Sequence, residues 1–160
     1  MVNKLSPLDI DEVNKLGSLL NPKFKKAFHI ESLNSNEYIL VYKEDNKILG
    51  FIHYYINYEI VDLLNIIVKE EYRNKMIGTI LMDYMITSLP KTVQKIMLEV
   101  DETNFPAIKF YYNFNFEEIS RRTHYYNGND AIIMERKLLW NKKMYIFWLL
   151  NHLVMKQVCQ

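Results

Sequence analysis

The sequence of 160 residues predicts a domain of the α+β class. Three observations lead to this class: an amphipathic helical pattern near the start, a run of neighbouring strands after it, and helices that alternate with strands in the second half. Hydrophobic residues make up 49% of the chain and charged residues 24%, which argues against a disordered chain. The length favours one domain with a substantial core.

The first elements are a short strand within residues 1–6 and a helix that starts at Ser6-Pro7. Serine is a favoured N-cap, and proline is a favoured first-turn residue. Apolar residues at helical spacing continue to Asn21-Pro22, where we expect the helix to stop. Residues 23–36 have no clear pattern, although a short helix would fit part of them.

Two strands follow over residues 38–42 and 47–58, and the turn at residues 44–47 predicts that they form a hairpin. Gly50 indicates a β-bulge in the second strand. Residues 60–68 continue the sheet, ending in an unbroken apolar run that is typical of a buried strand.

The stretch 63–82 joins this strand to a helix through a polar turn at residues 69–75. The helix is indicated by apolar residues at i, i+3, i+4, i+7 and i+8, namely Ile77, Ile80, Leu81, Tyr84 and Met85. A strand, a turn and a helix start in this order offer unpaired backbone N–H groups and the positive end of the helix dipole to an anion. The stretch is either an ordinary corner or a site for a phosphate-bearing ligand.

The second half alternates between helices and strands. Its expected elements are a helix end at Leu89-Pro90, a strand at 95–100, an amphipathic helix capped by residues 103–106, and strands at 117–126 and 131–138 around a turn at 127–130. The apolar face of the second helix carries Ala107, Ile108 and Tyr111.

Charge and cysteine content exclude several classes of function. The formal net charge of +1 gives no general attraction to nucleic acid. The single cysteine, Cys159, excludes an internal disulfide and a cysteine-based zinc site, and the four histidines lack metal-ligand spacing. No signal-peptide pattern is present at the start, so we expect a cytoplasmic protein without a metal.

Residues 139–160 differ from the 1–138 domain, because they combine dense aromatic and aliphatic residues with lysines and no acidic residue. The apolar part, residues 144–155, has about 12 residues, whereas a bilayer span needs about 20. Three interpretations remain for this helical extension: docking on its own domain, a contact in a homodimer, or a helix lying on an anionic membrane. The chain is expected to be a monomer or a homodimer.

Three residues are candidates for chemistry. Glu99 interrupts an apolar strand on the face opposite Leu98 and Val100, so it is either a solvent-facing residue or a base in a cleft. Tyr111, on an apolar helix face, is by default a core residue. Asn104 stands at a helix start, where its default role is capping.

The turn resembles the acetyl-CoA pyrophosphate loop of the GNAT N-acetyltransferases, Arg/Gln-x-x-Gly-x-Gly/Ala, through Arg73 and Gly78. Met76 replaces the first glycine of that pattern. A Cβ there is expected to crowd the phosphates and weaken cofactor binding, although a negative φ would still let the residue present its N–H.

Residues 98–134 resemble the RimI-type ribosomal-protein-alanine N-acetyltransferases within that family. The resemblance rests on Leu98-Glu99-Val100, Asn104, Ala107, Tyr111, Asn115-Phe116, Arg122, Tyr125-Tyr126 and Asp130–Met134. Asn115 occupies a position where the pattern has glycine. Asn can replace glycine there because it readily adopts the αL conformation. Asn129 replaces a glutamate, and the loop before it is shorter than the pattern.

The resemblance implies a GNAT fold over residues 1–138, with a mostly antiparallel sheet of about seven strands. It also implies that acetyl-CoA lies between two splayed strands. Its contacts would be the backbone of Ile66, Ile67 and Val68, a phosphate cradle that follows Arg73, and Asn104 near the reactive end. The cradle would consist of Asn74, Lys75, Met76, Ile77, Gly78 and Thr79.

For catalysis, the resemblance implies that Glu99 is the general base and that Tyr111 protonates the departing thiolate, with a backbone N–H near Val68 for the oxyanion. Tyr125 and Tyr126 would either wall the substrate slot or pack at a sheet edge, and Arg122 would be only a surface charge. The predicted activity is N-α-acetylation of a protein N-terminus, most simply an Ala-starting ribosomal protein. The alternatives are a GNAT enzyme for a small amine or lysine side chain, and a weakly catalytic acyl-CoA-binding interaction protein.

Overall fold

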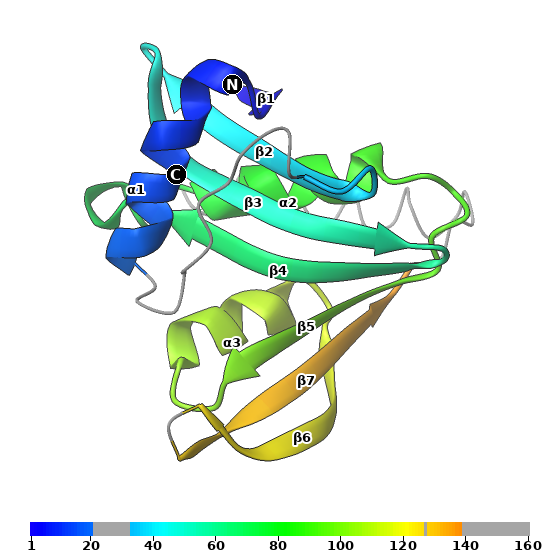
Figure 1. Cartoon of the computed structure of the whole chain (residues 1–160). Helices are drawn as coiled ribbons and strands as arrows, with labels where there is room; N and C mark the ends of the chain where they lie inside the picture. Colours follow the sequence, from blue (N-terminus) through cyan, green and yellow to red (C-terminus); the bar gives the residue numbers. More distant parts are fainter. Residues whose placement is uncertain (21–32, 127, 139–160) are drawn as a thin grey trace, which may run out of the picture.

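The computed structural model describes residues 1–20, 33–126 and 128–138. Its strands are β1 (Val2–Lys4), β2 (Glu37–Glu44), β3 (Lys47–Asn57), β4 (Ile60–Val68), β5 (Lys95–Asp101), β6 (Glu117–Tyr126) and β7 (Asn129–Lys137). They form one seven-stranded sheet in the order β1-β2-β3-β4-β5-β7-β6 (Figure 1). Neighbouring strands are antiparallel except β4 and β5, which are parallel. The predicted fold class and sheet are confirmed.

The helices cover both faces of the sheet. They are α1 (Ile10–Leu20), α2 (Ile77–Ser88) and α3 (Phe105–Asn113), with 3-10 turns η1 (Pro7–Asp9) and η3 (Glu70–Tyr72). Val13 and Leu16 of α1 pack on one face against a cluster that includes Phe51. The larger core lies on the other face, where α2 and α3 pack against the sheet.

The start of the first helical segment follows from its cap. Ser6 is the N-cap of η1, which runs directly into α1, and its N–H donates to Asp9 Oδ2 at 3.0 Å. The start expected at Ser6-Pro7 is therefore confirmed. The stop expected at Asn21-Pro22, residues 23–32 and 127, and the extension 139–160 lie outside the described residues.

The β2–β3 hairpin has the predicted turn. Asp45 and Asn46 both have positive φ, 47° and 61°, as a type I′ turn requires. A register shift beside Gly50 gives β3 one extra residue, because Tyr42 pairs with Gly50 whereas Lys43 pairs with Ile48. A Cβ on Gly50 would lie 2.7 Å from the Ile67 carbonyl oxygen, so the close approach of β4 requires a glycine there.

The buried face of α2 differs from the predicted stripe. Its buried residues are Ile77, Leu81, Met82, Met85 and Ile86. Tyr84, which the spacing placed on the apolar face, is 46% exposed. Apolar residues occur on nearly all sides of this helix, so more than one face has the spacing of an apolar stripe. Packing against the sheet decides which of these faces is buried.

The sheet opens between its two parallel strands. Pairing of β4 with β5 runs from Ile60↔Lys95 to Leu63↔Leu98 and stops there. Leu64 is an extra residue in β4, because Tyr54 pairs with Leu63 whereas His53 pairs with Asn65. Figure 1 shows the two strands adjacent at one end and apart at the other. The splayed strands expected from the resemblance are therefore present.

No helix among the described residues is long and apolar enough to cross a membrane.

Candidate active site

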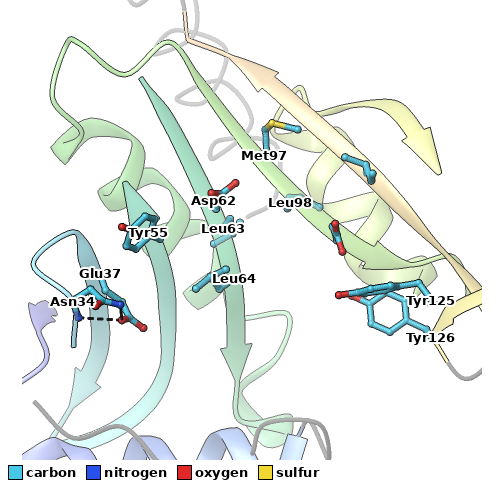
Figure 2. A pocket seen from close by; sticks show the side chains of 12 residues that line it. Asn34, Glu37, Tyr55, Asp62, Leu63, Leu64, Met97, Leu98, Tyr125 and Tyr126 are labelled. Carbon is cyan, nitrogen blue, oxygen red and sulfur yellow. Dashed lines mark hydrogen bonds between the residues drawn. The ribbon is translucent and has the colours of Figure 1, made fainter. Parts of the chain in front are cut away.

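A pocket of about 550 Å³ lies on the face of the sheet opposite α2 and α3 (Figure 2). Its walls come from β2, β3, β4, β5, β7 and the end of β6. The lining residues are Asn34, Glu37, Tyr55, Asp62, Leu63, Leu64, Met97, Leu98, Glu99, Tyr125, Tyr126 and Ile133. The pocket therefore spans the place where β4 and β5 part.

Glu99 is part of the pocket wall and is not a freely solvated strand residue. Leu98 and Val100 are buried in the core, and the Glu99 side chain, 30% exposed, lies on the opposite face as predicted. Its Oε1 lies 3.1 Å from Nη2 of Arg122, which comes from β6. Arg122 is therefore more than the isolated surface charge that the sequence suggested.

Tyr125 and Tyr126 reach the pocket because β6 is irregular before them. Arg122 pairs with Ala131 and Tyr126 with Asn129, so residues 123–125 face the single residue Asp130. His124 has φ 54° within this bulge, and its N–H donates to Asp130 Oδ1 at 3.0 Å. Both tyrosines line the pocket.

The rings of Tyr125 and Tyr126 pack against each other, and the guanidinium of Arg122 lies over the Tyr125 ring. Their centroids are 5.0 Å apart in an edge-to-face arrangement, and the Arg122 guanidinium lies 4.8 Å from the Tyr125 ring centroid. Burial raises the pKa of Tyr126, and the charge of Glu99 raises it further. The phenol is therefore held in its protonated form beside the carboxylate.

Tyr111 is the buried residue of α3 and lies on the other face of the sheet, in the larger core. Its ring packs against Phe110 and Phe116, each with a centroid distance of 5.6 Å. Burial raises the pKa of Tyr111 above its usual range, and Tyr126 adds to the effect. Tyr111 does not line the pocket, and it and Glu99 lie on opposite faces of the sheet.

Two residues just before α2 have left-handed backbone conformations. Asn74 and Met76 both have φ 61°, and Met76 is the N-cap of α2. The sequence suggested that Met76 could still present its N–H to a phosphate if its φ were negative. Its φ is positive, so this condition is not met. Methionine instead takes the backbone conformation that glycine adopts most easily. Its side chain is 44% exposed.

The start of α2 offers the predicted N–H groups. The first hydrogen bond of the helix runs from the Ile80 N–H to the Met76 carbonyl at 2.9 Å, so Ile77, Gly78 and Thr79 precede all intrahelical donors. The Ile77 side chain is buried in the core, so only its backbone is available. A Cβ on Gly78 would meet Phe110 at 3.6 Å, which is ordinary contact. Packing within the chain therefore does not require this glycine.

The remaining cofactor candidates have visible structural roles. Ile66, Ile67 and Val68 pair with β3 on one side and face the gap on the other, beyond the last pair with β5. Asn104 caps α3, because its Oδ1 accepts from the Ala107 N–H at 3.3 Å. Arg73 ends η3, and Lys75 Nζ lies 4.8 Å from the Tyr72 ring centroid. The gap and the helix start together fit an extended ligand with a phosphate.

Comparison with known proteins assigns the fold to a family. A model of the acetyltransferase (GNAT) family matches residues 10–116. The chain belongs to this family. An N-alpha-acetyltransferase of Saccharolobus solfataricus is 32% identical over 149 residues, which cover 81% of this chain and 88% of that protein. The ribosomal protein bS18-alanine N-acetyltransferase of Escherichia coli K12 is 28% identical over 142 residues, with coverage of 76% and 96%.

Among solved structures, an aminoglycoside 6′-N-acetyltransferase complexed with coenzyme A has a TM-score of 0.76. It is 17% identical, and the match covers 88% of this chain and 98% of that chain. The family match and these relatives identify this GNAT protein as an acetyl-transferring enzyme. This finding counts against the alternative of a weakly catalytic acyl-CoA-binding interaction protein.

Sequence reasoning missed several residues of the pocket of this GNAT enzyme. Asp62 interrupts the apolar strand β4 as Glu99 interrupts β5, and that signal was present in the sequence. Glu37 was not recognisable, because it depends on tertiary contacts: His53 Nε2 lies 2.7 Å from Glu37 Oε1, and Asn65 Nδ2 lies 3.3 Å from His53 Nδ1. No group of three or more metal-ligating side chains occurs among the described residues.

Proposed function

We propose that this GNAT enzyme acetylates the α-amine of a protein N-terminus, with acetyl-CoA as the donor. The observation that carries the proposal is the position of Glu99 in a pocket walled by Tyr125 and Tyr126, beside the gap between β4 and β5. The names of two relatives support it, since both are N-terminal acetyltransferases and one acts on an alanine of a ribosomal protein.

Acetyl-CoA would supply the activated acetyl group as a thioester. The backbone of Ile66–Val68 would hold its extended part along the open edge of β4, and the residues 74–79 would hold its phosphates at the start of α2. Arg73 and Lys75, both exposed, would add positive charge there. Asn104 would use the amide nitrogen that is not engaged in capping α3.

Glu99 and Tyr111 would divide the proton transfers between the two faces of the sheet. The carboxylate of Glu99 takes a proton from the substrate ammonium, whose pKa near 7.7–8.0 makes this step easy at neutral pH. The amine nitrogen then bonds to the acetyl carbon, and the bond from that carbon to sulfur breaks. Tyr111 keeps its proton at neutral pH and gives it to the sulfur as that bond breaks.

The finer part of the proposal is the substrate, a ribosomal protein that starts with alanine. The pattern from Leu98 to Met134 and the relative from Escherichia coli support it. One departure bears on substrate choice: Tyr126 pairs with Asn129, so the β6–β7 hairpin closes in a tight turn directly after the tyrosines. We infer that so short a hairpin would restrict the substrate less, and would also admit a lysine side chain or a small amine.

Mass-spectrometric acetylation assays test both levels of the proposal. Short peptides starting with Ala, Ser, Met or Gly are incubated with the enzyme and acetyl-CoA, beside an N-terminally blocked lysine peptide and spermidine. We expect the label on the α-amine and the highest rate for the Ala peptide. Label only on the blocked lysine peptide or on spermidine would contradict the proposal and favour a side-chain or small-amine acetyltransferase.

A further inference from the structure

The lining of the pocket is acidic. Glu37, Asp62 and Glu99 all contribute carboxylates to it, and none of its lining residues is a lysine, an arginine or a histidine. A substrate that enters this pocket therefore meets a negative electrostatic potential. Arg122, which pairs with Glu99, stands outside this lining and balances only one of the three carboxylates.

The three carboxylates differ in the partners that already offset their negative charge. Glu99 is paired with Arg122, and Glu37 is held by His53 at 2.7 Å and by the Asn34 N–H at 3.3 Å. Asp62 has no hydrogen bond or ion pair with any residue that the structure describes. A partly buried carboxylate without a partner costs free energy, which a cation bound in the pocket would offset.

The position of Asp62 relative to Glu99 indicates which part of a substrate it would meet. Asp62 pairs with Met97 across β4 and β5, and Glu99 is two residues further along β5 on the same face. Strand spacing and rise place the two Cα atoms about 8 Å apart. An extended peptide advances about 3.3–3.6 Å per residue, so a peptide whose N-terminus lies at Glu99 and which runs toward β4 would bring the side chain of its second residue within reach of Asp62.

An aromatic ring lies next to this carboxylate. Tyr55 of β3 is the cross-strand partner of Asp62, and both side chains face the pocket. Figure 2 shows Asp62 and Leu64 in the middle of the pocket, between Glu37 on one side and Tyr125 and Tyr126 on the other. A carboxylate beside an aromatic face suits a guanidinium or ammonium group on a flexible side chain.

We propose that Asp62, with Tyr55 beside it, selects protein N-termini that carry arginine or lysine as their second residue. The inference rests on the proposed function and names the substrate class within it. Glu99 takes the proton of the reacting amine, and Asp62 forms an ion pair with the positive side chain of the next residue. Asp62 is thus a specificity-determining residue and takes no part in proton transfer.

The test compares three peptides that differ only at the second position: Ala-Arg, Ala-Gln and Ala-Glu. The kcat/KM for α-amine acetylation is measured for the wild-type enzyme, for Asp62→Asn and for the control Asp45→Asn. The control removes the same charge from an exposed turn outside the pocket. We expect the wild type and Asp45→Asn to favour Ala-Arg over Ala-Gln by about tenfold, as one partly desolvated charge pair gives, and to favour Ala-Glu least.

In Asp62→Asn, the ratio between Ala-Arg and Ala-Gln should fall below about threefold. An unchanged ratio in this variant, or no preference in the wild type, would overturn the role of Asp62 while leaving α-amine acetylation established. Absence of α-amine label on all three peptides, with label on spermidine or a blocked lysine peptide, would overturn the proposed function and this inference together. A melting curve of Asp62→Asn shows that the variant is folded.

Discussion

Nη2 of Arg122 lies 3.1 Å from Oε1 of Glu99, although their strands β6 and β5 are separated by β7. The residue of β7 opposite Arg122 is Ala131, whose methyl group leaves room for the arginine side chain to cross. The same guanidinium lies over the Tyr125 ring. One arginine thus connects the candidate base with the aromatic wall of the pocket.

Replacing Arg122 with alanine should lower kcat/KM by about tenfold, because the carboxylate of Glu99 and the Tyr125 ring lose a common anchor. Arg122→Lys should recover part of the loss, since lysine keeps the charge without the planar stacking surface. The effect on stability should be below about 1 kcal/mol, as for other exposed ion pairs. Steady-state kinetics and thermal melting measure the two effects.

Arg121→Ala is the matched control for this experiment. Arg121 is also exposed and ion-paired, but its partners are Glu118 and Glu102, which do not line the pocket. A loss of activity in Arg121→Ala equal to that in Arg122→Ala would show that the contact with Glu99 has no special role.

Glu99→Gln and Tyr111→Phe should each reduce kcat by about 10²–10⁴-fold while leaving acetyl-CoA affinity nearly unchanged, because each removes one proton transfer. The raised pKa of Tyr111 adds a pH expectation. The phenol of Tyr111 stays protonated at pH values above the usual phenol pKa of about 10. Ionisation of Tyr111 should therefore not lower kcat at pH 9. Calorimetric titration with acetyl-CoA and a pH profile of kcat test these points, and near wild-type turnover in both variants would refute the assigned roles.

Met76→Gly should bind acetyl-CoA more tightly than the wild type. Glycine removes the Cβ from the phosphate-binding turn, which should raise the affinity. It also relieves the strain of φ 61°, about 1–2 kcal/mol, which should raise the free energy of unfolding. Asn74→Gly is the control, because Asn74 has the same φ but tolerates it well. Titration calorimetry compares the two variants with the wild type. Equal affinity in Met76→Gly and the wild type would contradict the hypothesis that the Cβ of Met76 crowds the phosphates.

Gly50→Ala and Gly78→Ala should affect different properties of the enzyme. The new Cβ at position 50 would lie 2.7 Å from a backbone oxygen of β4, so we expect a loss of about 1–3 kcal/mol in the free energy of unfolding. The Cβ at position 78 meets only ordinary contacts within the chain, so stability should change little while acetyl-CoA affinity falls. Denaturant unfolding and ligand titration of both variants check this division.

Asp62→Asn should raise the melting temperature at pH 7. Burial raises the pKa of the Asp62 carboxyl, so the folded chain binds this proton more tightly than the unfolded chain. Ionisation at neutral pH therefore lowers the free energy of unfolding, and this cost is absent below the unfolded pKa near 3.9. The advantage of Asp62→Asn over the wild type should disappear near pH 3, and a stability gain of the same size at both pH values would contradict the explanation.

Local patterns in the sequence were sufficient for much of the fold. Apolar runs, turn residues, helix caps and the helical spacing of apolar residues placed all seven strands, the start of α1 and the two later helices, because these signals depend on neighbours close in the chain. Strand alternation also set the face of Glu99. The turn before α2 was predicted from polar residues between an apolar strand and a helical stripe, and Arg73 and Gly78 gave its resemblance to the phosphate loop of the family.

Tertiary structure alone decided how these elements combine into a site. The parting of β4 and β5 beyond Leu63 and Leu98 put Asp62 and Glu99 in one pocket and separated Tyr111 from it. The sheet selected which side of α2 is buried. The bulge in β6 turned Tyr125 and Tyr126 inward and brought Arg122 to Glu99. Such contacts join residues far apart in the chain, and they arise from sheet register and packing, which no local spacing encodes.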